Sequence, residues 1–150
     1  MNRIHLVILW HMHQPQYRDP ATGRYVLPWT RLHALKDYWG MVRVLEEFPN
    51  VHATFNVVPS LGAQLEEYAG GHFNEPWFTL AFSPADKLTN EDKAELLQRG
   101  FQVNREHMLR RWPRYAELCD WAGHRGAAMF GLRDWRDLQL LASASSHARQ

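Results

Sequence analysis

The sequence predicts an α/β fold with parallel strands, followed by a helical insertion. Two short apolar runs, at residues 4–10 and 51–58, are rich in branched side chains, and each is followed by a proline. Between them the apolar residues recur at helical spacing. A strand, a helix and a second strand in this order favour a βαβ unit, in which the two strands are parallel.

The first run is almost uninterrupted by polar side chains, which is typical of a strand covered on both faces. Pro15 prevents further strand pairing after it. The connecting helix is predicted to begin at Leu35 and to end before Pro49. Its apolar stripe consists of Leu35, Tyr38, Trp39, Val42 and Leu45.

After the second run, Ser60 is in position to cap a short helix that Gly70 and Gly71 close. Residues 72–88 contain several prolines and aromatic residues without periodicity, so we expect an irregular segment there.

Two further helices are expected in the insertion. Thr89 and Asp92 have the spacing of a capping box, and the helix that they open is predicted to reach about Arg110. Pro113 is suited to the first position of a second helix, which is predicted to run to Ala122.

The last residues lose this periodicity. Residues 142–150 consist mainly of Ala and Ser, which predicts a disordered or aberrant tail. A chain of 150 residues is long enough for one globular domain with a core. We therefore expect one domain over residues 1–141 and a tail over residues 142–150.

The charge balance excludes a general polyanion-binding role. Lys and Arg number 17 against 16 Asp and Glu, which gives a net charge of +1. No nucleic-acid partner is expected from so small a charge. The one local basic cluster is interpreted as a solvated helix face; it consists of Arg105, Arg110, Arg111 and Arg114.

The sequence also indicates the cellular compartment. A single cysteine cannot form an internal disulfide. The apolar run that follows the first three residues has no small-residue cleavage site behind it and is too short to cross a bilayer. We expect a cytoplasmic protein without a membrane partner.

Polar side chains follow both predicted strands, where parallel α/β folds place their functional sites. His11, His13 and Gln14 follow the first strand, and Asn56 and Ser60 lie at the end of the second. Two histidines that are two residues apart project to the same side of a strand. Such a pair can bind a metal ion, can form hydrogen bonds with sugar hydroxyls, or can be buried and structural.

The sequence from His13 to Pro15, directly after an apolar strand, resembles the first conserved motif of glycoside hydrolase family 57. Residues 27–38 and 54–61 resemble the segments that follow this motif in the family. Residues 130–139 are similar to the beginning of a later segment, which here gives way to Ala and Ser. The resemblance therefore indicates an N-terminal segment, with a truncated continuation as the preferred explanation of the tail.

The resemblance implies the N-terminal part of an incomplete (β/α)7 barrel that acts on α-glucans with retention. It also implies a Glu nucleophile and an Asp acid/base, but no position here matches either, so we assign no catalytic residue and expect the chain by itself to be inactive. The implied substrate is an α-glucan or maltooligosaccharide, with no cofactor and no bound metal. The expected substrate-binding residues are His11, His13, Gln14, Trp29, Arg31, His33 and Asp37.

Four questions stay open from the sequence. His11 and His13 are also compatible with a metal-dependent hydrolase, although no third ligand can be identified. A carbohydrate-binding remnant without catalysis is a further hypothesis. For the loop residues a structural role is an alternative to ligand contact, and the simplest case is Asp37 paired with Arg31 or Lys36. The oligomeric state is not indicated.

Overall fold

The computed structural model of the chain describes residues 3–103, 106, 111–124 and 127–146, which fall into two units. The first unit is Met1–Pro76 and the second is Trp77–Gln150, in place of the single unit expected from the chain length. Each unit has its own buried residues, so each is described by itself.

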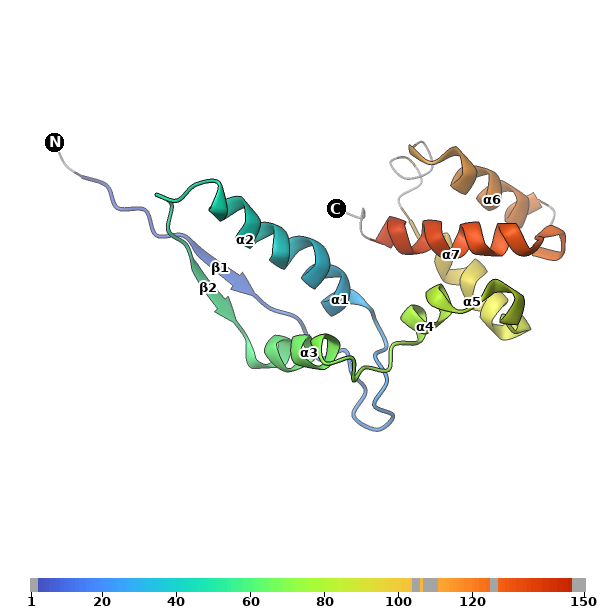
Figure 1. The fold of residues 1–150 in the computed structure, drawn as a ribbon, viewed down its shortest axis with the longest axis horizontal. Coiled ribbons are helices and arrows are strands. Elements are labelled where there is room, and N and C mark those ends of the chain that lie inside the picture. The colour runs from blue at the N-terminus through green and yellow to red at the C-terminus, as the bar shows by residue number, and fades with distance from the viewer. Residues whose placement is uncertain (1–2, 104–105, 107–110, 125–126, 147–150) are drawn as a thin grey trace. The chain divides into compact units, whose positions relative to one another are not determined.

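The first unit contains the predicted pair of parallel strands. Strand β1 spans Leu9–Met12 and strand β2 spans Thr54–Val57. They lie side by side and point the same way (Figure 1), with Leu9 opposite Thr54 and Met12 opposite Val57. The βαβ connection predicted from the order of apolar runs is therefore present.

Both strands are shorter than the apolar runs that predicted them. In the first run only Leu9 and Trp10 belong to β1, and the side chain of Ile4 is 95% exposed. The expectation of a strand covered on both faces is wrong for the described residues, because Leu9 and His11 of β1 are exposed. The apolar side chains of Leu6 and Val7, which precede β1, are likewise exposed.

The helix between the strands begins earlier than predicted. It starts with α1 (Trp29–His33), continues through a π-helical turn, η1 (Ala34–Tyr38), and ends as α2 (Trp39–Glu46). The first helical bond runs from the Leu32 amide to the Pro28 carbonyl, which explains the early start. The π-helical turn is notable because such turns occur frequently at functional sites.

Helix α3 (Pro59–Ala69) follows β2 directly, and Pro59 occupies its first turn. The prediction that Ser60 caps this helix is wrong, because Val58 is the N-cap residue and no side chain caps it. Ser60 Oγ instead donates a hydrogen bond to the Gln14 carbonyl. The helix is followed by Gly71 with φ of +70°, a conformation that glycine adopts without strain.

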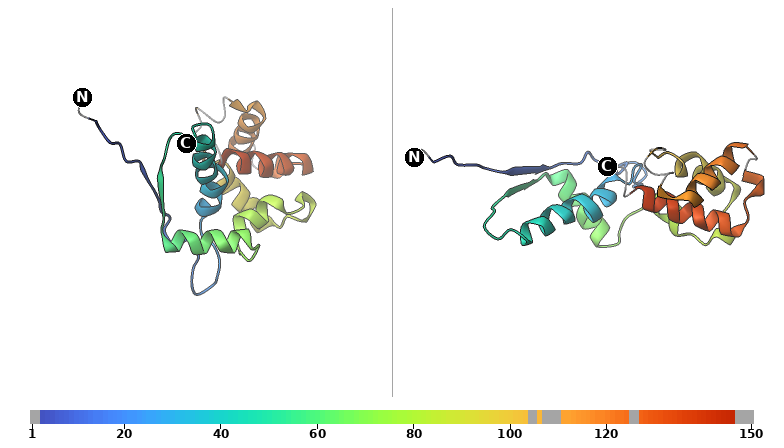
Figure 2. Two further views of the ribbon diagram at one scale, coloured as in Figure 1. Left: turned by 60° about the vertical axis from the view of Figure 1, so that its left-hand side comes forward. Right: turned by 90° about the horizontal axis from the view of Figure 1, so that it is seen from above.

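In the described part of the second unit all regular elements are helices (Figure 1, Figure 2). None of the helices among the described residues is both long and apolar enough to cross a membrane. The elements are α4 (Pro76–Phe82), η2 (Ala85–Lys87), α5 (Asn90–Gly100), α6 (Pro113–His124), η4 (Ala127–Met129) and α7 (Leu132–Ser146).

These helices confirm two expectations and correct a third. Thr89 and Asp92 form the predicted capping box at the start of α5, and Pro113 begins α6. The segment 72–88 is not irregular throughout, because α4 and η2 lie within it and bury apolar side chains, among them Trp77 and Leu80. Helix α5 ends at Gly100, and its predicted end at Arg110 lies outside the described residues.

An apolar core holds the second unit together. Leu96, Leu118 and Leu138 have no exposed surface, and they come from α5, α6 and α7. Gly100 allows α5 to approach α7 closely, because a Cβ atom at Gly100 would lie 3.2 Å from Leu138 Cδ1. The hydroxyl of buried Tyr115 donates a hydrogen bond to the Gly100 carbonyl.

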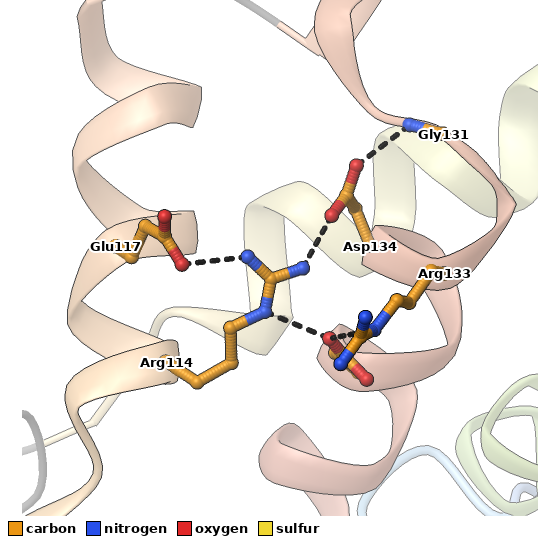
Figure 3. Close-up of polar contacts among 6 residues, drawn as sticks. Arg114, Glu117, Gly131, Arg133 and Asp134 are labelled. Carbon is orange, nitrogen blue, oxygen red and sulfur yellow. Dashed lines mark hydrogen bonds and ion pairs between the residues drawn. The ribbon is translucent and has the colours of Figure 1, made fainter.

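An ionic cluster joins α6 to α7 (Figure 3). The Arg114 guanidinium lies 2.6 Å from Glu117 and 2.7 Å from Asp137, and it also pairs with Asp134. These carboxylates raise the pKa of Arg114 further above its usual value, so it is always charged. Arg114 is therefore paired and not part of a free basic face, whereas Arg105 and Arg110 lie outside the described residues.

Helix α7 corrects the predicted tail. It continues through Ser146, so the chain does not lose its regular structure after Leu141. Ala142 is only 2% exposed and belongs to the core, whereas Ala144 is exposed. Trp135, Leu138 and Ala142 are spaced three and four residues apart, which keeps them on one helix face. Residues 147–150 lie outside the described residues.

The packing of Ala142 predicts the effect of a charge at this point. Ala142→Glu should lower the free energy of unfolding by at least about 2 kcal/mol, because it places a carboxylate in the apolar core. Ala144→Glu is the matched control, on the exposed side, and should change it by less than about 0.5 kcal/mol. Urea unfolding of both variants measures this, and equal small effects would contradict a packed helix beyond Leu141.

Candidate functional site

His11 and His13 lie at the carboxyl end of β1 and are both exposed. Their ring centroids are 5.9 Å apart and their planes differ by 21°, so the rings are stacked. Met12 and Gln14, which alternate with them, are buried. This confirms that the two histidines share one side, and it excludes the alternative of two buried structural histidines.

Gln14 is buried, and both polar atoms of its side-chain amide form hydrogen bonds within the protein. Its Nε2 donates to the Tyr38 hydroxyl at 3.1 Å, and its Oε1 accepts from the Tyr17 hydroxyl at 2.9 Å. Ser60 fixes the Gln14 carbonyl at 3.0 Å. These bonds give Gln14 a structural role in holding the loop that follows β1.

The two phenols around Gln14 are protonated at neutral pH. Burial raises the pKa of Tyr17, and the neighbouring Tyr38 raises it further. Burial also raises the pKa of Tyr38, against a smaller opposite effect of the Gln14 hydrogen bond. Because Tyr38 accepts the bond from Gln14, its own hydroxyl hydrogen can be donated to another acceptor.

Arg31 is engaged by a buried carboxylate. Its Nε and Nη2 lie 2.9 Å and 2.6 Å from the two oxygens of Glu75, in a bidentate pair. The Glu75 side chain is only 1% exposed, and it also accepts a hydrogen bond from the Tyr68 hydroxyl at 2.9 Å. Of the two structural alternatives for Asp37, pairing with Arg31 or with Lys36, the one with Arg31 is therefore wrong.

Asp37 pairs with His33 instead. His33 Nδ1 and Asp37 Oδ2 are 2.5 Å apart across one helical turn, and the His33 ring is tilted against Tyr38 with centroids 6.2 Å apart. The carboxylate can only accept, so Nδ1 carries the hydrogen. Gln14, His33 and Asp37 thus meet around Tyr38. Trp29 is half-buried at the first residue of α1.

Sequence reasoning missed the residues that connect these side chains. The sequence places Tyr38 in an apolar helix stripe and in a segment similar to the family, without indicating its hydrogen bond, and it places Glu75 in a segment expected to be irregular. Gln64 has a signal in the sequence, because it falls between Leu61 and Tyr68 on one face of α3. A polar residue in such a stripe indicates a buried hydrogen-bonding role.

The described residues contain no group of three or more His, Cys, Asp and Glu side chains that could hold a metal ion. His11 and His13 therefore have no third ligand of these types beside them within that part of the chain. A metal-dependent hydrolase based on this pair remains a hypothesis without the usual three protein ligands.

Comparison with known protein families shows to which family the chain belongs. The sequence profile of Glycosyl hydrolase family 57 matches residues 7–124, which is more than half of the 150 residues. The chain belongs to glycoside hydrolase family 57. Comparison with curated proteins and with solved structures gives no match. The family membership implies a carbohydrate substrate, and the matched range includes every substrate-binding residue expected from the sequence.

The buried hydrogen bond from Tyr68 to Glu75 predicts how the free energy of unfolding changes at alkaline pH. Burial, together with the negative charge of Glu75, raises the pKa of Tyr68 well above its ordinary value of about 10. Above about pH 10 the unfolded chain has lost a proton that the folded chain keeps, so the free energy of unfolding falls as pH rises. Below that pH this contribution is fully present.

Tyr68→Phe removes the titrating hydroxyl. Between about pH 9 and about pH 11 its free energy of unfolding should fall less steeply than that of the wild type. At about pH 8 the variant should be less stable, because Glu75 loses a hydrogen-bond donor. Urea unfolding across this pH range measures both effects, and parallel curves for the two proteins would count against the buried phenol.

Proposed function

We propose that this chain forms the N-terminal part of a family 57 catalytic domain, an incomplete (β/α)7 barrel, and supplies part of its α-glucan-binding site. The parallel pair of β1 and β2 with its connecting helix supports the barrel architecture. The match over residues 7–124 supports a carbohydrate substrate. That this carbohydrate is an α-glucan is part of the proposal.

The observation that carries the proposal is the exposed pair of His11 and His13 at the carboxyl end of β1. In parallel α/β folds this end of the strands is where substrates bind. An imidazole can donate one hydrogen bond and accept another, which suits the hydroxyl groups of a sugar. Two stacked imidazoles can therefore contact neighbouring hydroxyls of one glucose unit.

Residues of the connecting helix extend this surface in the proposal. The second carboxylate oxygen of Asp37 can accept from a hydroxyl, and Tyr38 can donate to one. Trp29 can stack on the apolar face of a pyranose ring. Arg31 is the weakest of the candidates, because Glu75 engages two of its nitrogens, and we assign it mainly to holding the loop.

Hydrolysis with retention needs two carboxyl groups about 5 Å apart across the scissile bond. No position of this sequence matches the nucleophile or the acid/base of the family. We therefore propose a role in substrate binding for these residues and assign none of them to catalysis. As a binding element, the chain would retain affinity for the sugar.

This proposal predicts sugar binding that depends on His13. Isothermal titration calorimetry of the full chain with a maltooligosaccharide should give measurable binding. His13→Ala should weaken the affinity by about tenfold, the value of one or two lost hydrogen bonds. His52→Ala changes an exposed histidine outside the surface and should have no effect.

Circular dichroism of both variants checks that they fold like the wild type. Absence of binding by a folded wild-type chain would remove the proposal, and so would equal losses in the two variants. Metal analysis of the same sample tests the competing hypothesis, because stoichiometric zinc bound through His11 and His13 would favour a metal-dependent hydrolase.

A further inference from the structure

The amide side chain of Gln64 lies inside the first unit, where it is 1% exposed. Its Nε2 donates to the Pro15 carbonyl at 3.0 Å and to the Ser60 carbonyl at 2.8 Å. Its Oε1 accepts from the Tyr17 amide at 3.1 Å and from the Thr30 hydroxyl at 3.2 Å. A glutamine amide has two hydrogens and two lone pairs, so all four are used.

Three of these four bonds leave helix α3. Pro15 and Tyr17 belong to the loop that directly follows His13 and Gln14. Thr30 has no exposed surface and lies between Trp29 and Arg31 at the start of α1. Gln64 therefore connects both segments that carry the proposed sugar-binding residues, although it is too deeply buried to contact a sugar itself.

The arrangement is specific for glutamine. A glutamate of the same shape could still accept from the Tyr17 amide and Thr30, but its carboxylate would face two carbonyl oxygens without a hydrogen to donate. An apolar side chain would leave the Pro15 carbonyl, the Tyr17 amide and the Thr30 hydroxyl without this partner. Either change would release the two segments from α3.

We propose that Gln64 is a positioning residue for carbohydrate binding. It sets the distance between the His11 and His13 pair and the start of α1, so that the histidines and Trp29 can contact the same glucan chain. This inference rests on the proposed function and names the residue that holds that site in shape.

The test uses Gln64→Glu together with a matched pair at Thr30, all in the full chain. Thr30→Val removes the hydroxyl with little change of shape, whereas Thr30→Ser keeps it. We expect Gln64→Glu to weaken maltooligosaccharide affinity by at least about tenfold and Thr30→Val to weaken it by a few-fold. Thr30→Ser should bind like the wild type, because it keeps the hydroxyl. If the packing of the Thr30 methyl group were what mattered, Thr30→Ser would bind more weakly.

A second measurement separates positioning from binding. Amide chemical shifts from nuclear magnetic resonance should move in residues 13–17 and 29–33 of Gln64→Glu, and those of the second unit should not. Gln98→Glu, at an exposed position of α5, is the control and should leave both loops and the affinity unchanged.

The outcomes are distinguishable. Shifted loop signals in Gln64→Glu, together with a wild type that binds no maltooligosaccharide, would overturn the proposed function and keep the loop-holding part of the inference. Unchanged loop signals, or wild-type affinity in Gln64→Glu, would overturn the role of Gln64. If Gln64→Glu does not fold, the maltooligosaccharide affinities of Thr30→Val and Thr30→Ser are compared instead. Equal affinity of these two variants would overturn the role of Gln64.

Discussion

Burial of one amide group constrains the first unit. Gln64 is withdrawn from water, and an amide in such a place costs free energy unless its donors and acceptors all find partners. Those partners come from the loop after β1, from the start of α1 and from α3 itself. The amide is fully satisfied only when the three segments come together. Their contact fixes the positions of the loop after β1 and of the start of α1, which carry the proposed binding residues.

The two units are stabilised by different kinds of contact. Among the described residues of the first unit the buried polar side chains are Gln14, Thr30, Gln64 and Glu75, and they bond to one another, to tyrosines, to Arg31 or to backbone groups. The second unit has an apolar core built from leucines and aromatic rings, to which Gln139 adds bonds to the Leu80 and Ser83 carbonyls. Directional bonds hold geometry more tightly than apolar contacts, which suits the unit that carries the proposed binding surface.

Local patterns in the sequence predicted local structure well. The capping box at Thr89 and the shared side of His11 and His13 follow from spacing over a few residues, and the parallel strands follow from the order of the apolar runs. Features that depend on distant partners were not predictable: Arg31 pairs with Glu75, 44 positions away, and not with nearby Asp37. The predicted tail failed for another reason, since Ala favours helix and Ala142 continues the apolar face of Trp135 and Leu138.

Hydrogen exchange of glutamine side-chain amides tests the central constraint most directly. The Nε2 hydrogens of Gln64 are bonded to two carbonyls in a buried place, so they should exchange at least about a hundredfold more slowly than those of exposed Gln98 and Gln102. All three can be compared in one nuclear magnetic resonance sample of the full chain. Equal exchange rates for the three side chains would contradict the account, because Gln64 would then be open to water and could not hold the two loops.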